Sequence, residues 1–291
     1  MPERLQAMSG ILTRWSAGEP PSEETLFQVN TDRVLRDSRK QMAAASAGSG
    51  IAVLPLYGVV TQRGNMVDDI SGPGSTSTQQ FSAVLRQMLA DDTVGQILID
   101  IDSPGGSVYG VAELASEIVK ARAQKPVIAV ANSLAASAAY WLGCSASEFY
   151  VTPGGEVGSI GVWQAHFDYS KALEEDGVKP TLISAGKFKV EGNPYVPLDE
   201  QAQAFMQSRV DDYYNAFVEA VAIGRGVSVN DVRTGMGEGR VLGADAAMAQ
   251  NMVDGIASFD DVLTKMQANI RSTPVRSSSR LKQARDALAL I

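Results

Sequence analysis

Two short runs of small residues constrain the fold of this chain most strongly, because each lies between a strand pattern and a helix pattern. The first is Ser103–Gly106, which follows the apolar run Gly95–Ile101. The second is Ala135–Ala139, which surrounds Ser137 and follows the apolar run Val127–Val130. Strand-to-helix turns of this kind predict βαβ units and a mainly parallel sheet. We therefore expect the two turns to lie side by side at one edge of that sheet.

The second turn offers a nucleophile, and the first offers backbone hydrogen-bond donors. Ser137 is flanked only by small residues, so a peptide has room to approach its hydroxyl. Gly105 and Gly106 lack side chains, which lets their N–H groups come close to a substrate. The N–H of Ala138 would point toward the oxygen on which charge develops during acyl transfer. Each run also has a purely structural interpretation, since Ala-Ala-Ser-Ala-Ala packs well in a helix and Gly-Gly forms tight turns.

A serine hydroxyl needs a base to remove its proton, and the chain offers two kinds. The single histidine, His166, lies two residues before Asp168 and permits a Ser-His-Asp arrangement. Lys187 and Lys189 follow Gly186 in a predicted loop, and a lysine can serve as base where burial lowers its pKa. Alternation places both lysines on one face of an extended segment, so their position alone does not choose between them.

Hydrophobic periodicity along the rest of the chain predicts a single large α/β domain. Further strands are predicted over four apolar or β-branched runs: Ile51–Val60, Phe149–Val151, Ile160–Trp163 and Thr181–Ser184. Helices are predicted where apolar residues recur at helical spacing: Phe81–Leu89, Val108–Val119, Ala136–Gly143, Tyr169–Glu175 and Asp199–Gly224. The segments Gly243–Gln250 and Phe259–Ala268 complete the domain.

Composition and charge divide the chain into three segments. Residues 1–49 are expected to form a helical accessory arm, residues 50–270 the α/β domain, and residues 271–291 a Ser-rich linker with a short basic tail. The formal net charge of the chain is −8. The last segment carries +4 and the remainder −12, because one acidic residue there, Asp286, accompanies five basic residues: Arg271, Arg276, Arg280, Lys282 and Arg285.

Several classes of protein are disfavoured by these features. A body with a net negative charge is not an obvious nucleic-acid binder. The single cysteine, Cys144, excludes an internal disulfide and fits a reducing compartment. The charged N-terminus does not resemble a signal peptide. The uncharged run Val127–Ser147 has the length of a membrane span, but its serines and many alanines favour a buried strand followed by a buried helix.

Four motifs occur in a fixed order along the chain: Ser103–Gly106, Ala135–Ala139, Gly158–Gly161 and Gly186–Pro194. In this order and at these separations they resemble the signal peptide peptidase A family of serine peptidases. They are especially similar to its tailed-phage branch, the protein C head-maturation peptidases. Three further segments strengthen the phage match: Ile51–Pro55, Ala172–Glu174 and Lys189–Pro194. The resemblance covers about residues 50–260.

The resemblance implies a crotonase-like, Clp-protease-like fold with a Ser-Lys dyad. Ser137 matches the family's nucleophile and Lys189 its general base, while Lys187 matches a neighbouring lysine that is not assigned as the base. The backbone N–H groups of Gly106 and Ala138 match the oxyanion hole. The family also implies a homo-oligomer with composite sites and no metal or organic cofactor.

We therefore expect a soluble serine endopeptidase of a phage or prophage head, located in the bacterial host cytoplasm or the prohead. Its expected partners are peptide or protein substrates, such as scaffold or capsid proteins, and further copies of itself, with no nucleic acid and no membrane span. One alternative is a bacterial signal peptide peptidase A-like enzyme. A second is a non-catalytic capsid-assembly protein of the same fold. A third is a crotonase-type enzyme acting on acyl-CoA, which the dedicated serine and the lysine loop disfavour.

Overall fold

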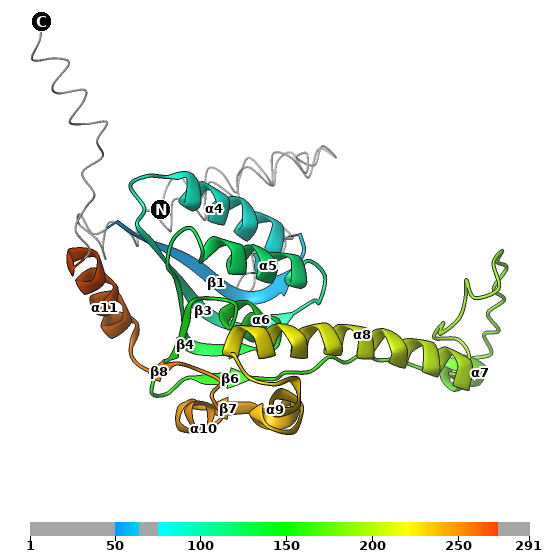
Figure 1. Ribbon diagram of the computed structural model, residues 1–291. Helices are drawn as coiled ribbons and strands as arrows, with labels where there is room; N and C mark the ends of the chain where they lie inside the picture. Colours follow the sequence, from blue (N-terminus) through cyan, green and yellow to red (C-terminus); the bar gives the residue numbers. More distant parts are fainter. Residues whose placement is uncertain (1–49, 64–74, 273–291) are drawn as a thin grey trace, which may run out of the picture.

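An eight-stranded sheet forms the centre of the described chain (Figure 1). The computed structural model describes residues 50–63 and 75–272. The predicted N-terminal arm, residues 1–49, lies outside these ranges, as do residues 64–74 and 273–291, which include nearly all of the predicted basic tail.

The sheet is almost entirely parallel, which confirms the predicted mainly parallel α/β class. Its strands follow the order β2-β1-β3-β4-β5-β8, while β6 pairs in parallel with β4 and antiparallel with β7. The strand bounds are β1 Ile51–Thr61, β2 Ser75–Ser77, β3 Gln96–Gly106, β4 Val127–Ala136, β5 Glu148–Val151, β6 Glu156–Gly158, β7 Val241–Gly243 and β8 Gly255–Ile256. The carboxyl ends of β3 and β4 are therefore neighbours, as the sequence predicted.

Helices cover both faces of the sheet because alternate strand residues point to opposite faces. Three helices share one core with the sheet: α4 (Thr78–Ala90), α5 (Val111–Ala121) and α6 (Ala138–Gly143). Leu54 of β1 is fully buried in this core. On the opposite face, Val53 and Leu98 pack with Val262 of α11 (Phe259–Ser272). The sheet is thus the middle layer of the molecule.

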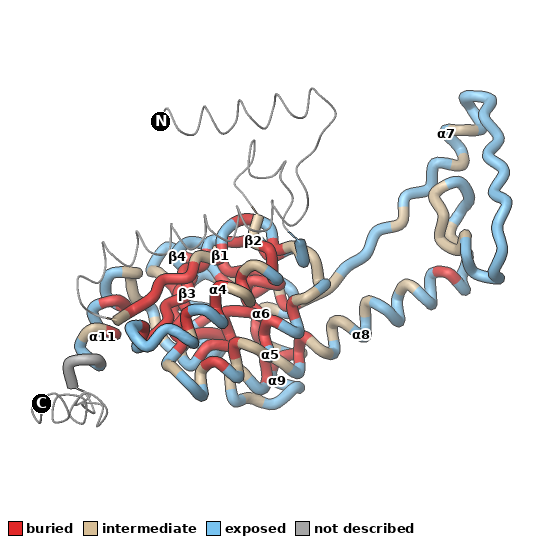
Figure 2. The backbone as a smooth tube through the Cα atoms, turned by 90° about the horizontal axis from the view of Figure 1, so that it is seen from above, coloured by how far each residue is buried: buried red, intermediate tan, exposed pale blue. Residues whose placement is uncertain are grey.

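Helix α8 (Glu200–Arg225) lies partly on this body and partly beyond it (Figure 2). Phe217, in its C-terminal half, is buried in the core under α6. Its N-terminal half extends away from the body on the same side as the segment that carries α7 (Ser170–Glu175) (Figures 1 and 2). We call residues 164–208 the projection, and Ala202 is the one buried residue in it.

The chain after α8 returns to the sheet through short elements. These are α9 (Val229–Thr234), the 3₁₀ helix η1 (Met236–Gly239), β7 and α10 (Ala244–Ala249). At the end of α8, Arg225 forms a bidentate pair with Asp254, with N···O distances of 2.8 and 2.9 Å. Asp254 also accepts a hydrogen bond from the N–H of Phe149 in β5 at 2.7 Å. These contacts fasten the base of α8 to the sheet.

Two predicted strands are wrong. Ile160–Trp163 and Thr181–Ser184 form no strand, although their β-branched residues suit one. A β-branched run becomes a strand only where a neighbouring strand pairs with it, and these residues leave the sheet for the projection. A third difference is that β3 includes the whole Ser103–Gly106 run, which is therefore the end of a strand rather than a separate turn.

Candidate active site

Ser137 lies at a sharp turn between β4 and α6. Its backbone angles, φ 52° and ψ −123°, are rare for a residue with a side chain. The turn is held on both sides: the N–H of Ser137 donates to Gly158 O at 2.8 Å, and its carbonyl accepts from Trp141 N at 3.0 Å. Strained strand-to-helix turns of this kind present a nucleophile at the end of a sheet.

Gly105 packs directly against this turn. Its φ is +89°, and a Cβ at this position would lie 2.6 Å from Ala136 O and 2.7 Å from the Cβ of Ser137. Only glycine permits this approach. The buried hydroxyl of Ser103 fixes the strand end, because it donates to Gly58 O at 2.6 Å and accepts from Gly105 N at 3.1 Å. The sequence analysis gave Ser103 no such role.

Gly106 and Ala138, whose N–H groups the sequence analysis expects to form the oxyanion hole, lie at the ends of the elements that meet at Ser137. The N–H of Ser107 donates to Val60 O of β1 at 2.8 Å. Gly106 is the last residue of β3 and lines the same cleft as Ser137. Ala138 is the first residue of α6, so its N–H has no acceptor within the helix. The role of the Gly106 and Ala138 N–H groups as oxyanion donors stays a prediction.

A third turn from the sequence motifs also adjoins Ser137. Gly158 ends β6 opposite Ala136 of β4, and its φ of +126° turns the chain sharply. Ser159 follows with a φ of 54°, and its N–H donates to Arg240 O at 2.8 Å. The segment Gly158–Gly161 thus forms one border of the candidate site.

A cleft of about 1000 Å³ opens onto these turns. Its lining comprises Val59, Pro104–Tyr109, Ser137, Ser159, Gly161–Gln164, Arg209, Val210, Tyr213 and Gly239. The sequence analysis did not predict that α8 lines the cleft, because no local pattern of residues indicates where α8 packs. There Tyr213 packs edge-on against Tyr109, with ring centroids 6.2 Å apart, and the guanidinium of Arg209 lies 5.2 Å from the centroid of the Tyr213 ring.

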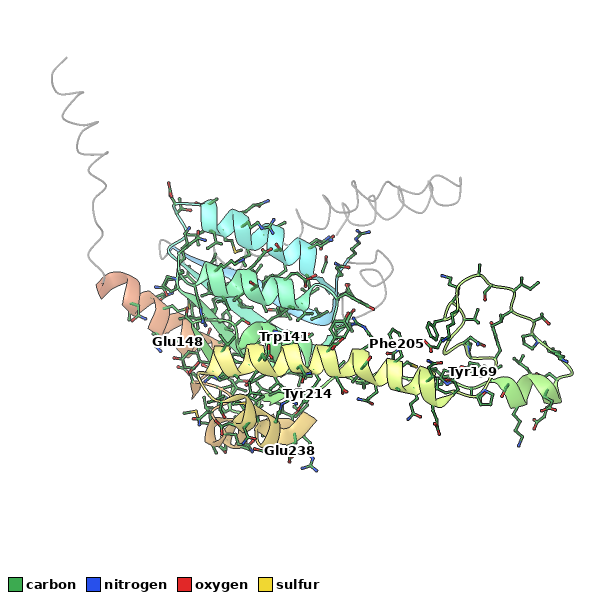
Figure 3. The ribbon with its side chains drawn as sticks, turned by 45° about the vertical axis from the view of Figure 1, so that its right-hand side comes forward. Trp141, Glu148, Tyr169, Phe205, Tyr214 and Glu238 are labelled. Carbon is green, nitrogen blue, oxygen red and sulfur yellow. The ribbon has the colours of Figure 1, made fainter. Side chains whose placement is uncertain are left out.

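The packing of α8 on α6 supports the nucleophile turn from below. Trp141 stacks on Phe217 with ring centroids 4.7 Å apart and planes 6° apart. Trp141 and Tyr214 lie where α8 meets the body (Figure 3). Gly224 allows the close approach, since a Cβ there would lie 2.3 Å from Cys144 O. Burial raises the pKa of the Cys144 thiol to about 12, which makes this cysteine unreactive.

Lys189 lies on the projection and does not line the cleft of its own chain. Its loop lies beyond the outer end of α8, near Tyr169 and Phe205, both labelled in Figure 3. Lys189 is exposed, and its side chain makes no hydrogen bond or ion pair within residues 50–63 and 75–272. The ammonium of Lys187 instead lies over the ring of Phe188, 4.7 Å from its centroid.

His166 and Asp168, the alternative catalytic residues, also lie on the projection and away from the cleft lining. The Nε2 of His166 is 3.0 Å from Asn193 O. The carboxylate of Asp168 accepts a hydrogen bond from Ser170 N at 2.8 Å, and the hydrogen bonds with Ser170 lower the pKa of Asp168. Within one chain, these residues and Ser137 therefore form no triad.

In the described part of the chain, no group of three or more histidine, cysteine, aspartate or glutamate side chains is placed to hold a metal ion. No helix between residues 50 and 272, outside the gap at 64–74, has the length and apolar character of a membrane span.

The chain is similar to a family of peptidases and to two phage proteins. The model of peptidase family S49 matches residues 119–272. Capsid assembly protease C of Escherichia phage lambda is 36% identical over 231 residues, which are 79% of this chain and 52% of that protein. Head-tail preconnector protein GP5 of Enterobacteria phage P21 is 34% identical over 259 residues, 86% of this chain and 51% of that protein.

A bacterial protein is also similar. The putative signal peptide peptidase SppA of Enterococcus faecium is 26% identical over 237 residues, which are 81% of this chain and 68% of that protein. The chain therefore spans about half the length of the two phage relatives and about two thirds of the bacterial one.

Proposed function

Because the chain belongs to peptidase family S49, we propose that it is a serine endopeptidase in which Ser137 is the nucleophile and Lys189 the general base. The observation that carries the proposal is the strained turn at Ser137 with Gly105 packed against it. A residue is held in such a conformation at functional sites more often than elsewhere. The cleft in front of the turn provides room for a peptide.

The proposed reaction proceeds in two steps. The amine of Lys189 takes the hydroxyl proton as the oxygen of Ser137 attacks the peptide carbonyl carbon. The N–H groups of Gly106 and Ala138 stabilise the negative oxygen of the tetrahedral intermediate. Lys189 then gives its proton to the leaving amine, and an ester on Ser137 remains. Water, activated by Lys189, hydrolyses this ester and restores the enzyme.

The position of Lys189 leads us to place it in the cleft of a second copy of the chain. It is exposed on the projection, and it is absent from the cleft lining of its own chain. A lysine accepts a proton at neutral pH only where it is desolvated. Docking of the projection against a second copy would bury the amine and bring it to Ser137 of the partner subunit. The proposed active enzyme is therefore a homo-oligomer with composite sites.

The proposed setting is a phage or prophage head, in the host cytoplasm or the prohead. The printed names of the two phage relatives refer to capsid assembly and to the head-tail preconnector, and they support this setting. The proposed substrates are scaffold or capsid proteins, which include the chain itself. The likeness to the bacterial peptidase favours a second candidate, a peptide-degrading enzyme of the cell. Cleavage of purified scaffold protein at defined sites would favour the first candidate, and digestion of short peptides alone the second.

Covalent labelling tests the nucleophile directly. A fluorophosphonate probe followed by peptide mapping should label Ser137 in the assembled protein, because such probes react with activated serines. Ser137→Ala should lose the label, whereas Ser107→Ala, a change at another serine of the cleft, should keep it. Labelling of Ser107 or Ser159 in place of Ser137 would reject the assignment.

A further inference from the structure

The loop that carries Lys189 is built by its own backbone hydrogen bonds. The N–H of Lys189 donates to Gly186 O at 3.1 Å, and that of Glu191 donates to Phe188 O at 3.1 Å. The next turn is closed by Asn193. These bonds make Gly186–Pro194 a compact unit, although it lies on a segment that the body does not cover.

Asn193 gathers most of the bonds that close this unit. Its side-chain Nδ2 donates to Val190 O at 2.8 Å, and its backbone N–H donates to the same oxygen at 3.3 Å. Its Oδ1 accepts from Tyr195 N at 3.0 Å. Residues 190–194 are all half-buried, whereas residues 177–189 are exposed. The half-buried part of the loop therefore begins directly after Lys189.

Two bonds tie this unit to the extended segment that leads out into the projection. The Nε2 of His166 lies 3.0 Å from Asn193 O, and the N–H of Tyr169 donates to Pro194 O at 2.8 Å. Because a carbonyl oxygen only accepts, Nε2 must carry the proton in the first bond. The neutral Nε2–H form and the imidazolium can both donate in this way, so the bond persists whether or not His166 is charged.

We propose that His166 is a positioning residue that holds the Lys189 loop through its hydrogen bond to Asn193 O. The inference rests on the proposed role of Lys189 as general base. A base must come within about 3 Å of the hydroxyl whose proton it takes. If the loop that carries the base moves by more than a fraction of this distance, kcat falls. The bond of His166 spans 27 residues of chain and fixes the far end of the loop to a second segment.

The test compares two substitutions of His166 in the full chain. His166→Ala removes the donor and should lower kcat about ten-fold, the size expected for one lost hydrogen bond at a catalytic group, with little change in KM. His166→Gln places an amide N–H close to the position of Nε2 and should recover most of kcat. Lys120→Ala, an exposed change on α5 of the body, should behave as the wild type.

The pH–rate profile separates positioning from proton transfer. The profile of His166→Gln should keep the wild-type midpoint, since the bond exists in both charge states of histidine. Two results would overturn the inference and leave the proposed dyad intact, provided that Lys189→Met is inactive. The first is full kcat in His166→Ala. The second is a His166→Gln enzyme that is as slow as His166→Ala. If both His166 variants are inactive while Lys189→Met is active, His166 is the base and the proposed dyad is wrong.

Discussion

At the scale of single residues, the backbone of Ser137 connects the fold with the proposed chemistry. A side chain at φ 52° and ψ −123° costs about 1–3 kcal/mol, and the cost is tolerated because the N–H of Ser137 is bonded to Gly158 O and its carbonyl to Trp141 N. Glycine would adopt the same angles without strain. A residue other than glycine at this position is therefore expected to serve function rather than stability.

This strain predicts opposite effects on activity and stability. Ser137→Ala and Ser137→Gly should both abolish peptide cleavage. Of the two, Ser137→Gly should be more stable by about 1 kcal/mol, because relief of the strain at the positive φ outweighs the larger conformational entropy that glycine loses on folding. Thermal unfolding with a parallel activity assay measures both effects. Equal melting temperatures would show that the turn is unstrained, and full activity in either variant would exclude Ser137 as nucleophile.

Gly105 gives a second prediction at this scale. Gly105→Ala introduces a Cβ 2.6–2.9 Å from three atoms of the Ser137 turn, so the turn or the strand end must move. We expect kcat to fall by about 100-fold or more, since a shift of about 1 Å at a reacting group has this effect. Gly154→Ala, where a Cβ would meet nothing within 4 Å, is the control and should keep wild-type kcat.

At the scale of elements, helix α8 links the nucleophile turn to the projection. Its inner half is stacked on α6 through Phe217 and Trp141, and its last turn is held by the pair of Arg225 and Asp254. Its outer half forms part of the projection near the loop of Lys189. The anchoring of the inner half therefore sets the direction in which the projection leaves the body.

The pair at the end of α8 predicts pH-dependent stability. Burial opposes ionisation of Asp254, but hydrogen bonds from Arg225 and the N–H of Phe149 outweigh it and lower the pKa of Asp254. A lowered pKa stabilises the fold above the unfolded pKa of about 3.9, and this contribution is lost as the pH falls through the folded value. Asp254→Asn should cost about 1–2 kcal/mol at pH 7, a value reduced by partial solvent screening.

Denaturant titrations from pH 7 to pH 3 measure this contribution. The stability difference between the wild type and Asp254→Asn should shrink at the acid end. Asp212→Asn, which removes the exposed pair with Arg209, should cost no more than about 0.5 kcal/mol at any pH. A difference for Asp254→Asn that stays constant down to pH 3 would contradict the argument.

At the scale of the whole molecule, the projection is the surface through which the proposed homo-oligomer would assemble. Half of the large exposed hydrophobic side chains of the described chain lie on it: Phe167, Tyr169, Val178, Leu182, Ile183, Phe188, Tyr195, Val196 and Phe205. Apolar side chains gathered in this way mark interaction surfaces. Ile183 is 96% exposed, so no contact within its own chain accounts for it.

Substitutions on the projection should separate assembly from folding. Ile183→Asp combined with Phe205→Asp should reduce the mass of the oligomer and the peptidase activity together. The melting temperature of the single chain should change little, because exposed positions contribute little to stability. Light scattering and an activity assay measure the two losses. If the double variant forms an active oligomer of unchanged mass, the projection is not an assembly surface.

Mixing inactive variants tests whether the site is composite. Ser137→Ala and Lys189→Met should each be inactive, and Lys187→Met should keep most of its activity. When the two inactive chains are refolded together in equal amounts, about one quarter of sites should combine an intact Ser137 with an intact Lys189 from a neighbour. Activity should therefore return to about one quarter of the wild-type value and rise with pH, since only the neutral amine accepts a proton. No recovery would indicate that both residues act within one chain.

The sequence by itself determined the elements and the part of the site that lies at strand ends. The apolar periodicity predicted β1, β3, β4 and the main helices, and the small residues at Ser103–Gly106 and Ala135–Ala139 predicted two adjacent turns. These features are local, because the carboxyl ends of neighbouring parallel strands must meet. The family comparison confirmed the expected peptidase family, and the parallel sheet confirmed the expected α/β class.

Only the tertiary structure decided where the remaining parts lie. The strand propensity of Thr181–Ser184 was overridden because no strand is there to pair with it, and α8 became a wall of the cleft because Gly224 lets it approach α6. Lys189 lies outside the cleft that contains Ser137, because the segment that carries Lys189 projects from the body. Contacts between residues far apart in sequence depend on packing over the whole molecule, and a local pattern of residues does not contain that information.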